Sequence, residues 1–154
     1  MLTTVVLLAL TAACSAGGGA GSGDGTSAPA PSKPPVPAGP GAEELVEDLR
    51  SGPGGEDLGE VRDNSSTCSN EAAGGDSHER DCRRLLVTDQ VSVYEFPVDD
   101  VAVEWVNRYG EFHGEEWRRV DRFALVWNTP EQEAVPAERR DEITELVENR
   151  LGEG

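Results

Sequence analysis

The stretch YEFPVDDVAVEWVNRYGEFHGEEWRRVDRFALVW, residues 94–127, holds all eight aromatic side chains of this 154-residue chain. Each large ring buries roughly 150–250 Å² when it is packed, so the stretch supplies much of the core. Its first half predicts a helix over 99–110. Asp99 can act as the N-cap and Gly110 as the C-cap, and apolar residues recur between them at helical spacing: Ala102, Trp105, Val106 and Tyr109.

The second half of the stretch, residues 115–127, predicts two strands. Phe123, Leu125 and Trp127 fall on one face of the longer strand, because apolar side chains alternate there. Asp121 and the residue after it mark a turn or a bulge between the two strands.

Outward from this stretch the chain predicts further strands and helices. Segments 83–88 and 91–98 favour a β-hairpin. Apolar residues run together in both, so we expect the second face of the sheet to be at least partly covered. Thr129–Gln132 has the form of a capping box with proline at the first helical position, and 136–151 predicts the final helix.

The N-terminal part of the domain begins with a short predicted helix over 42–50, followed by a polar loop over 53–81 that carries few apolar residues. Helices and strands in this order indicate an α+β fold. We expect a small, mostly antiparallel sheet of about four strands, with helices packed mainly on one face.

Residues 15–41 are rich in glycine and serine at first and in proline later. Such a segment cannot build a core, and its composition is typical of a flexible coil that continues as a stiffer polyproline spacer. The glycines match no phosphate-binding loop, because neither the dinucleotide-binding nor the Walker spacing is met.

Residues 2–13 are uncharged and mostly apolar, but they are too few to span a bilayer, which takes roughly 20 residues. Ala12, Ala13 and Cys14 resemble the lipobox of a bacterial lipoprotein precursor, although Thr11 stands where that family usually has leucine. The resemblance implies a signal peptide over 1–13 and a diacylglycerol on Cys14. The alternatives are an ordinary secretory signal in which Cys14 is incidental, or a buried apolar helix.

If the lipobox resemblance holds, the chain divides into three parts. These are a signal peptide at 1–13, a lipidated cysteine and tether at 14–41, and one acidic α+β domain at 42–154. No lysine or arginine precedes Cys14, and one interpretation is that a basic segment lies upstream of Met1. Arginine is used almost to the exclusion of lysine. That bias indicates a GC-rich coding sequence, as in an actinobacterium.

Three cysteines are an odd number, and in an exported protein the odd one needs a partner or a modification. If Cys14 carries lipid, Cys68 and Cys82 remain as one pair that should oxidise outside the cytoplasm. Closing that loop stabilises the fold by roughly 3 kcal/mol in the chain-entropy model. The alternative is two reduced thiols in a cytosolic chain.

The formal net charge of -17 excludes one broad class of partner. Such a surface repels nucleic acid and anionic lipid head groups. It leaves cationic partners and divalent ions possible, and a domain that senses a cation is one function compatible with it.

No catalytic or metal-binding constellation emerges from the sequence. His78 and His113 lie in separate polar segments and read as exposed loop residues. A zinc site of Cys68, His78 and Cys82 would need thiolates, which oxidation removes. EF-hand ligand spacing for calcium does not occur, so we expect no cofactor and no metal.

Two weaker patterns could support hydrolysis. Gly75-Asp76-Ser77-His78 partly matches the opening block of a serine esterase, but turn chemistry explains it equally well. Neighbouring carboxylates, Asp99 with Asp100 and Glu115 with Glu116, could act as general acid and base if an apolar pocket separated their pKa values. In a chain this acidic, such pairs also arise by chance.

The aromatic residues themselves could line a ligand groove, with Phe112 and Trp117 as the members that fit the core periodicity least. A core role is nevertheless the expectation for most of them. From the anchor, the spacer, the disulfide and the absence of a catalytic constellation, we expect a non-catalytic binding, adaptor or accessory module, held on the outer face of the cell membrane by acylated Cys14. Its other partner would be an envelope protein or a small ligand. The competing hypotheses are a small envelope hydrolase using carboxylates within 99–116 and the cation-sensing domain.

Overall fold

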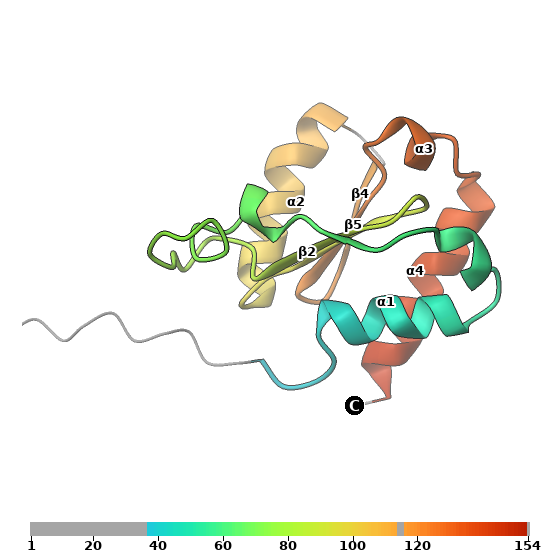
Figure 1. The fold of residues 1–154 in the computed structure, drawn as a ribbon, viewed down its shortest axis with the longest axis horizontal. Coiled ribbons are helices and arrows are strands. Elements are labelled where there is room, and N and C mark those ends of the chain that lie inside the picture. The colour runs from blue at the N-terminus through green and yellow to red at the C-terminus, as the bar shows by residue number, and fades with distance from the viewer. Residues whose placement is uncertain (1–36, 114–115, 154) are drawn as a thin grey trace, which may run out of the picture. The chain divides into compact units, whose positions relative to one another are not determined.

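The computed structural model describes residues 37–113 and 116–153 (Figure 1). Its centre is a five-stranded sheet in the order β1-β2-β3-β5-β4, in which every neighbouring pair of strands is antiparallel. The strands are β1 Arg62–Asp63, β2 Arg84–Val87, β3 Ser92–Glu95, β4 Trp117–Val120 and β5 Phe123–Val126. The fold is thus α+β, as predicted, with five strands instead of four.

The additional strand is β1, two residues long, which lies within the polar loop. It pairs with β2, Arg62 opposite Val87 and Asp63 opposite Leu86. Two polar residues leave no periodic pattern in a sequence, so only the pairing with β2 identifies them as a strand.

Four α-helices and two short 3₁₀ helices complete the described part of the chain. They are α1 Ala42–Ser51, η1 Gly55–Leu58, η2 Ser65–Thr67, α2 Asp99–His113, α3 Pro130–Glu133 and α4 Ala137–Gly152. The predicted capping box is confirmed at α3, where the Thr129 hydroxyl accepts the Gln132 N–H at 3.3 Å. Helix α2 continues past Gly110, which we expected to end it, because that glycine does not adopt the positive φ of a C-cap.

Helices cover both faces of the sheet (Figure 1). Helices α1 and α4 pack on the face that carries Phe123, Leu125 and Trp127, all fully buried as predicted for one face of that strand. Helix α2 packs on the opposite face, over Ala124 and Val126. Two separate apolar cores result, and the second of them contains the disulfide and most of the aromatic rings.

The β4–β5 turn holds the segment that leads into α1. Asp121 takes the left-handed conformation, with φ 53°. The buried Arg122 guanidinium donates to the carbonyls of Ala38 at 3.1 Å and Pro40 at 2.6 Å, and it faces Glu95 at 3.6 Å. The Glu95 carboxylate in turn accepts the backbone N–H of Ala42 at 2.9 Å. These contacts fix where the chain enters the domain.

Candidate functional site

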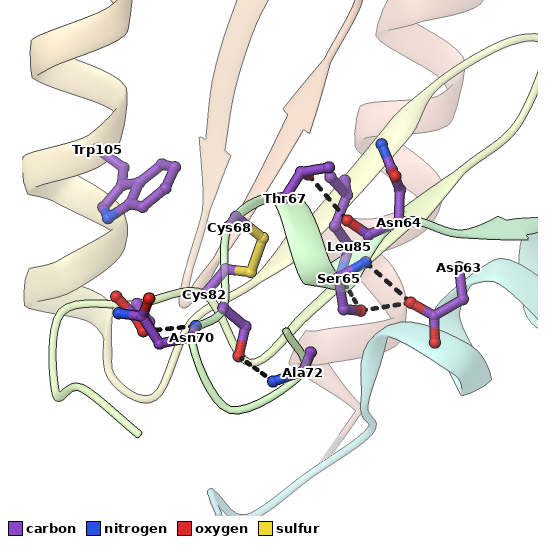
Figure 2. The surroundings of a disulfide bond; sticks show 12 residues. Asp63, Asn64, Ser65, Thr67, Cys68, Asn70, Ala72, Cys82, Leu85 and Trp105 are labelled. Atoms are coloured by element: carbon purple, nitrogen blue, oxygen red, sulfur yellow. Dashed lines mark hydrogen bonds between the residues drawn. A yellow bond between two sulfur atoms is a disulfide. The ribbon is translucent and has the colours of Figure 1, made fainter. Parts of the chain in front are cut away.

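The Cys68–Cys82 disulfide closes the polar loop, as predicted, with its Cα atoms 5.5 Å apart (Figure 2). It joins the end of η2 to the residues just before β2. Inside the loop, the Asp81 carboxylate accepts the Asn70 N–H at 2.9 Å and the Ser69 hydroxyl accepts the Ala72 N–H at 3.3 Å. The covalent bond and these turns take the place of an apolar core in this segment.

Helix α2 holds the loop from the other side. The Trp105 indole extends from α2 towards the disulfide (Figure 2), and its N–H donates to the carbonyl of Arg80 at 2.9 Å. The Arg80 guanidinium forms an ion pair with Glu104, the neighbour of Trp105 on the helix. The disulfide loop and α2 are therefore bonded to each other, and both contribute side chains to the second core.

Four aromatic side chains meet beside the disulfide and form what we call the aromatic groove: Tyr94, Trp105, Tyr109 and Trp117. Each ring contacts two others, so the contacts form a closed circuit. Ring centroids lie 6.2 Å apart for Tyr94–Trp105, 5.4 Å for Trp105–Tyr109, 5.0 Å for Tyr109–Trp117 and 5.2 Å for Trp117–Tyr94.

Local structure explains this meeting of rings. Trp105 and Tyr109 are one helical turn apart, on the face of α2 that lies against the sheet. Tyr94 and Trp117 come from β3 and β4, which flank strand β5. The β5 residue opposite Tyr94 is Ala124, whose small side chain leaves room for rings to approach each other across that strand.

The groove is a cavity of about 250 Å³, lined by the four rings together with Thr67, Cys68 and Asn128. No acidic or basic side chain of the described residues is among those that line it. Its volume lies below the roughly 300–1,000 Å³ of pockets that hold drug-sized ligands. It has room for a small group, and most of its lining is aromatic.

The rings of the groove differ in their exposure. Trp117 is 8% exposed, whereas Tyr94, Trp105 and Tyr109 are half-buried. The indole N–H of Trp117 is closed off from solvent and has no hydrogen-bond partner among the described residues. Burial raises the pKa of the Tyr94 phenol, and the nearby Tyr109 phenol adds to that effect. The Tyr94 phenol therefore stays uncharged at neutral pH.

Of the two residues that the sequence singled out for a groove, the structure places one in it. Trp117 contacts Tyr94 and Tyr109, while Phe112 is 78% exposed and is not among the lining residues. Sequence reasoning assigned the other three rings to the core. The signal that could have grouped Trp105 with Tyr109 is their spacing of four on the predicted helix, but their meeting with Tyr94 and Trp117 depends on the order of the strands.

The esterase-like residues lie in a second hollow at the disulfide loop, where Ser77, His78 and Asp81 are among the lining residues. His78 Nδ1 accepts the backbone N–H of Arg80 at 3.2 Å, and it lies 3.9 Å from the Asp81 carboxylate. A catalytic carboxylate would instead accept a hydrogen bond from Nδ1–H. The arrangement is that of an exposed turn.

Two of the carboxylates proposed for hydrolysis, Asp99 and Asp100, are on the surface of α2. Asp99 forms an ion pair with Arg119, and Asp100 is exposed. Glu104, on the same helix, binds both Arg80 and Arg108. None of these three carboxylates lines the aromatic groove.

The structure does not describe several of the residues for which the sequence predicts a role. Cys14, the signal peptide and the tether up to residue 36 lie outside the described residues, as do Glu115 and the side chain of His113. In the described ranges, 37–113 and 116–153, no group of three or more histidine, cysteine, aspartate or glutamate residues could hold a metal ion. Cys68 and Cys82 are bonded to each other, so neither supplies a thiolate.

Comparisons with protein-family models, with curated proteins and with solved structures gave no match. No helix within the described part of the chain has the length and apolar character needed to cross a membrane.

Proposed function

We propose that this protein is a non-catalytic binding module of the cell envelope, tethered to the outer face of the cell membrane through lipid on Cys14, with the aromatic groove as its ligand site. The observation that carries the proposal is the groove itself. Four aromatic side chains line a cavity, and no charged side chain of the described residues is among those that line it. Aromatic rings that line a small cavity are suited to binding, and no carboxylate, histidine or lysine of the described residues lines this one.

The proposed location rests on independent features of the chain. The lipobox-like Ala12-Ala13-Cys14 accounts for one cysteine, and the disulfide accounts for the other two. A disulfide persists in an oxidising compartment. The glycine- and proline-rich residues that follow Cys14 would give the domain reach beyond the bilayer surface.

Site-specific photo-crosslinking in intact cells tests whether the groove holds a ligand. A photoreactive phenylalanine analogue replaces Tyr109 in the groove, and in a matched strain it replaces Glu138, which is exposed on α4. We expect a defined adduct from position 109 and none from position 138, resolved by mass spectrometry of the purified protein. Equal adducts from both positions, or none from position 109, would contradict the proposal.

A further inference from the structure

The chemical class of the ligand is inferred by comparing the groove with the aromatic rings elsewhere in the domain that contact arginine side chains. Trp127, on the opposite face of the sheet, has the guanidinium carbons of Arg118 and Arg140 at 5.2 Å and 5.5 Å from its ring centroid. Phe123 has that of Arg122 at 4.7 Å. Both rings therefore lie against positive charge, at distances where the ring quadrupole attracts a cation.

The aromatic groove has the opposite character. Every cation–π contact found among residues 37–113 and 116–153 is to Trp127 or Phe123. No arginine of the described chain lines the groove, although it contains more aromatic rings than either of those sites. No guanidinium of the described residues lies over any of its four rings, so a cation from outside the chain would meet no competing side-chain cation there.

The charge of the whole molecule favours the same class of ligand. A net charge of -17 raises the local concentration of cations and lowers that of anions around the domain. The lining offers little for a polyhydroxylated ligand, because Thr67 and Asn128 are its only polar side chains apart from the ring substituents. The Thr67 hydroxyl already donates to the carbonyl of Asn64 at 2.8 Å.

From these contacts we infer that the aromatic groove binds a small organic cation of the quaternary ammonium type, held by cation–π attraction to Tyr94, Trp105, Tyr109 and Trp117. This inference rests on the proposed function, because it names the ligand class of the same site. A methylated ammonium suits the groove, since its charge is spread over an apolar surface that needs no hydrogen-bond acceptor. The cavity of about 250 Å³ limits the bound part to a head group of that size.

The test compares two ligands of nearly equal shape. The full-length protein in non-ionic detergent is titrated with choline and with dimethylbutanol, the neutral isostere in which carbon replaces the quaternary nitrogen. Tryptophan fluorescence and calorimetry measure binding at physiological ionic strength, where the Debye length is about 8 Å and diffuse attraction is screened. We expect saturable binding of choline that is at least about fivefold tighter than that of the isostere.

Variants on α2 distinguish the contribution of the Tyr109 ring to binding from that of its apolar bulk. Tyr109→Leu keeps the apolar bulk and removes the π face, so it should weaken choline binding about fivefold or more and leave the isostere unaffected. Tyr109→Phe retains the ring and should retain binding. Phe112→Leu, one turn away and exposed, is the matched control and should leave binding unchanged.

Three outcomes would overturn the inference: equal binding of choline and its isostere, choline binding that survives Tyr109→Leu, or tighter binding of a neutral disaccharide than of choline. None of these would remove an adduct formed at position 109 in cells. A groove that forms that adduct without preferring choline therefore contradicts the cation and leaves the binding function standing. A groove that forms no adduct contradicts the binding function itself.

Discussion

At the scale of single residues, Tyr94 links the groove to a measurable pH dependence. Its phenol has an ordinary pKa of 10.0, and burial raises that value in the folded protein. As the pH rises past 10.0, the unfolded chain loses this proton before the folded chain does. The folded state then binds more protons, so its stability falls with rising pH.

We therefore expect Tyr94→Phe to flatten the alkaline loss of stability. Below the ordinary pKa both states keep the phenol neutral, and Tyr94 contributes no pH dependence there. Urea unfolding at a series of alkaline pH values, for the wild type and for Tyr94→Phe, measures the difference in slope. Identical slopes in the two proteins would show that Tyr94 is not buried as described.

Gln132 shows what a sequence can and cannot predict at a single position. Thr129–Gln132 predicted a capping box, and the Gln132 side chain indeed accepts the Thr129 N–H at 3.3 Å. The same side chain is fully buried and donates to the carbonyl of Thr88 at 2.8 Å and to the Ser92 hydroxyl at 3.0 Å. The cap is local and was predictable, whereas the contacts to the β2–β3 turn depend on the tertiary fold.

At the scale of elements, strong periodicity or clear turn chemistry gave correct predictions. The helix that became α2, the 83–98 hairpin and the turn at Asp121 were all anticipated. The end of α2 was misplaced, because a glycine in a helix does not always cap it. Strand β1 leaves no pattern in the sequence. The sequence singled out only Trp117 among the four rings of the groove, because the order of the strands decides which rings meet.

The disulfide loop gives the prediction at this scale. The bond closes a loop with a sequence separation of 14, and the loop contains few buried apolar residues. Replacing both Cys68 and Cys82 by alanine should therefore lower the free energy of unfolding by about 3 kcal/mol. Urea denaturation measures this change, and a loss below about 0.5 kcal/mol would mean that the turns alone hold the loop.

At the scale of the whole molecule, the domain has two cores on opposite faces of one sheet, and the groove belongs to the core under α2. Arg122 and Glu95 fix the segment that enters α1. Ala38 and Pro40 contact the β4–β5 turn and do not line the groove.

The proposed anchor is tested on the intact chain. Cys14→Ala should abolish lipid attachment, and the protein should appear as a soluble, disulfide-bonded form or as an unprocessed precursor. Cell fractionation followed by intact-mass analysis distinguishes these forms. A processed Cys14→Ala protein that still fractionates with the membrane would contradict the anchor, while the groove would be unaffected.

The three tryptophans provide the most direct test of the central claim that the aromatic groove binds a small organic cation. Their indole N–H groups give separate signals in a ¹⁵N-correlated NMR spectrum. Trp105 and Trp117 lie in the groove, and Trp127 lies on the other face of the sheet as an internal reference. On titration with choline, we expect the Trp105 and Trp117 signals to shift saturably while the Trp127 signal stays in place. Equal shifts of all three signals, or no shift at Trp105 and Trp117, would contradict the account.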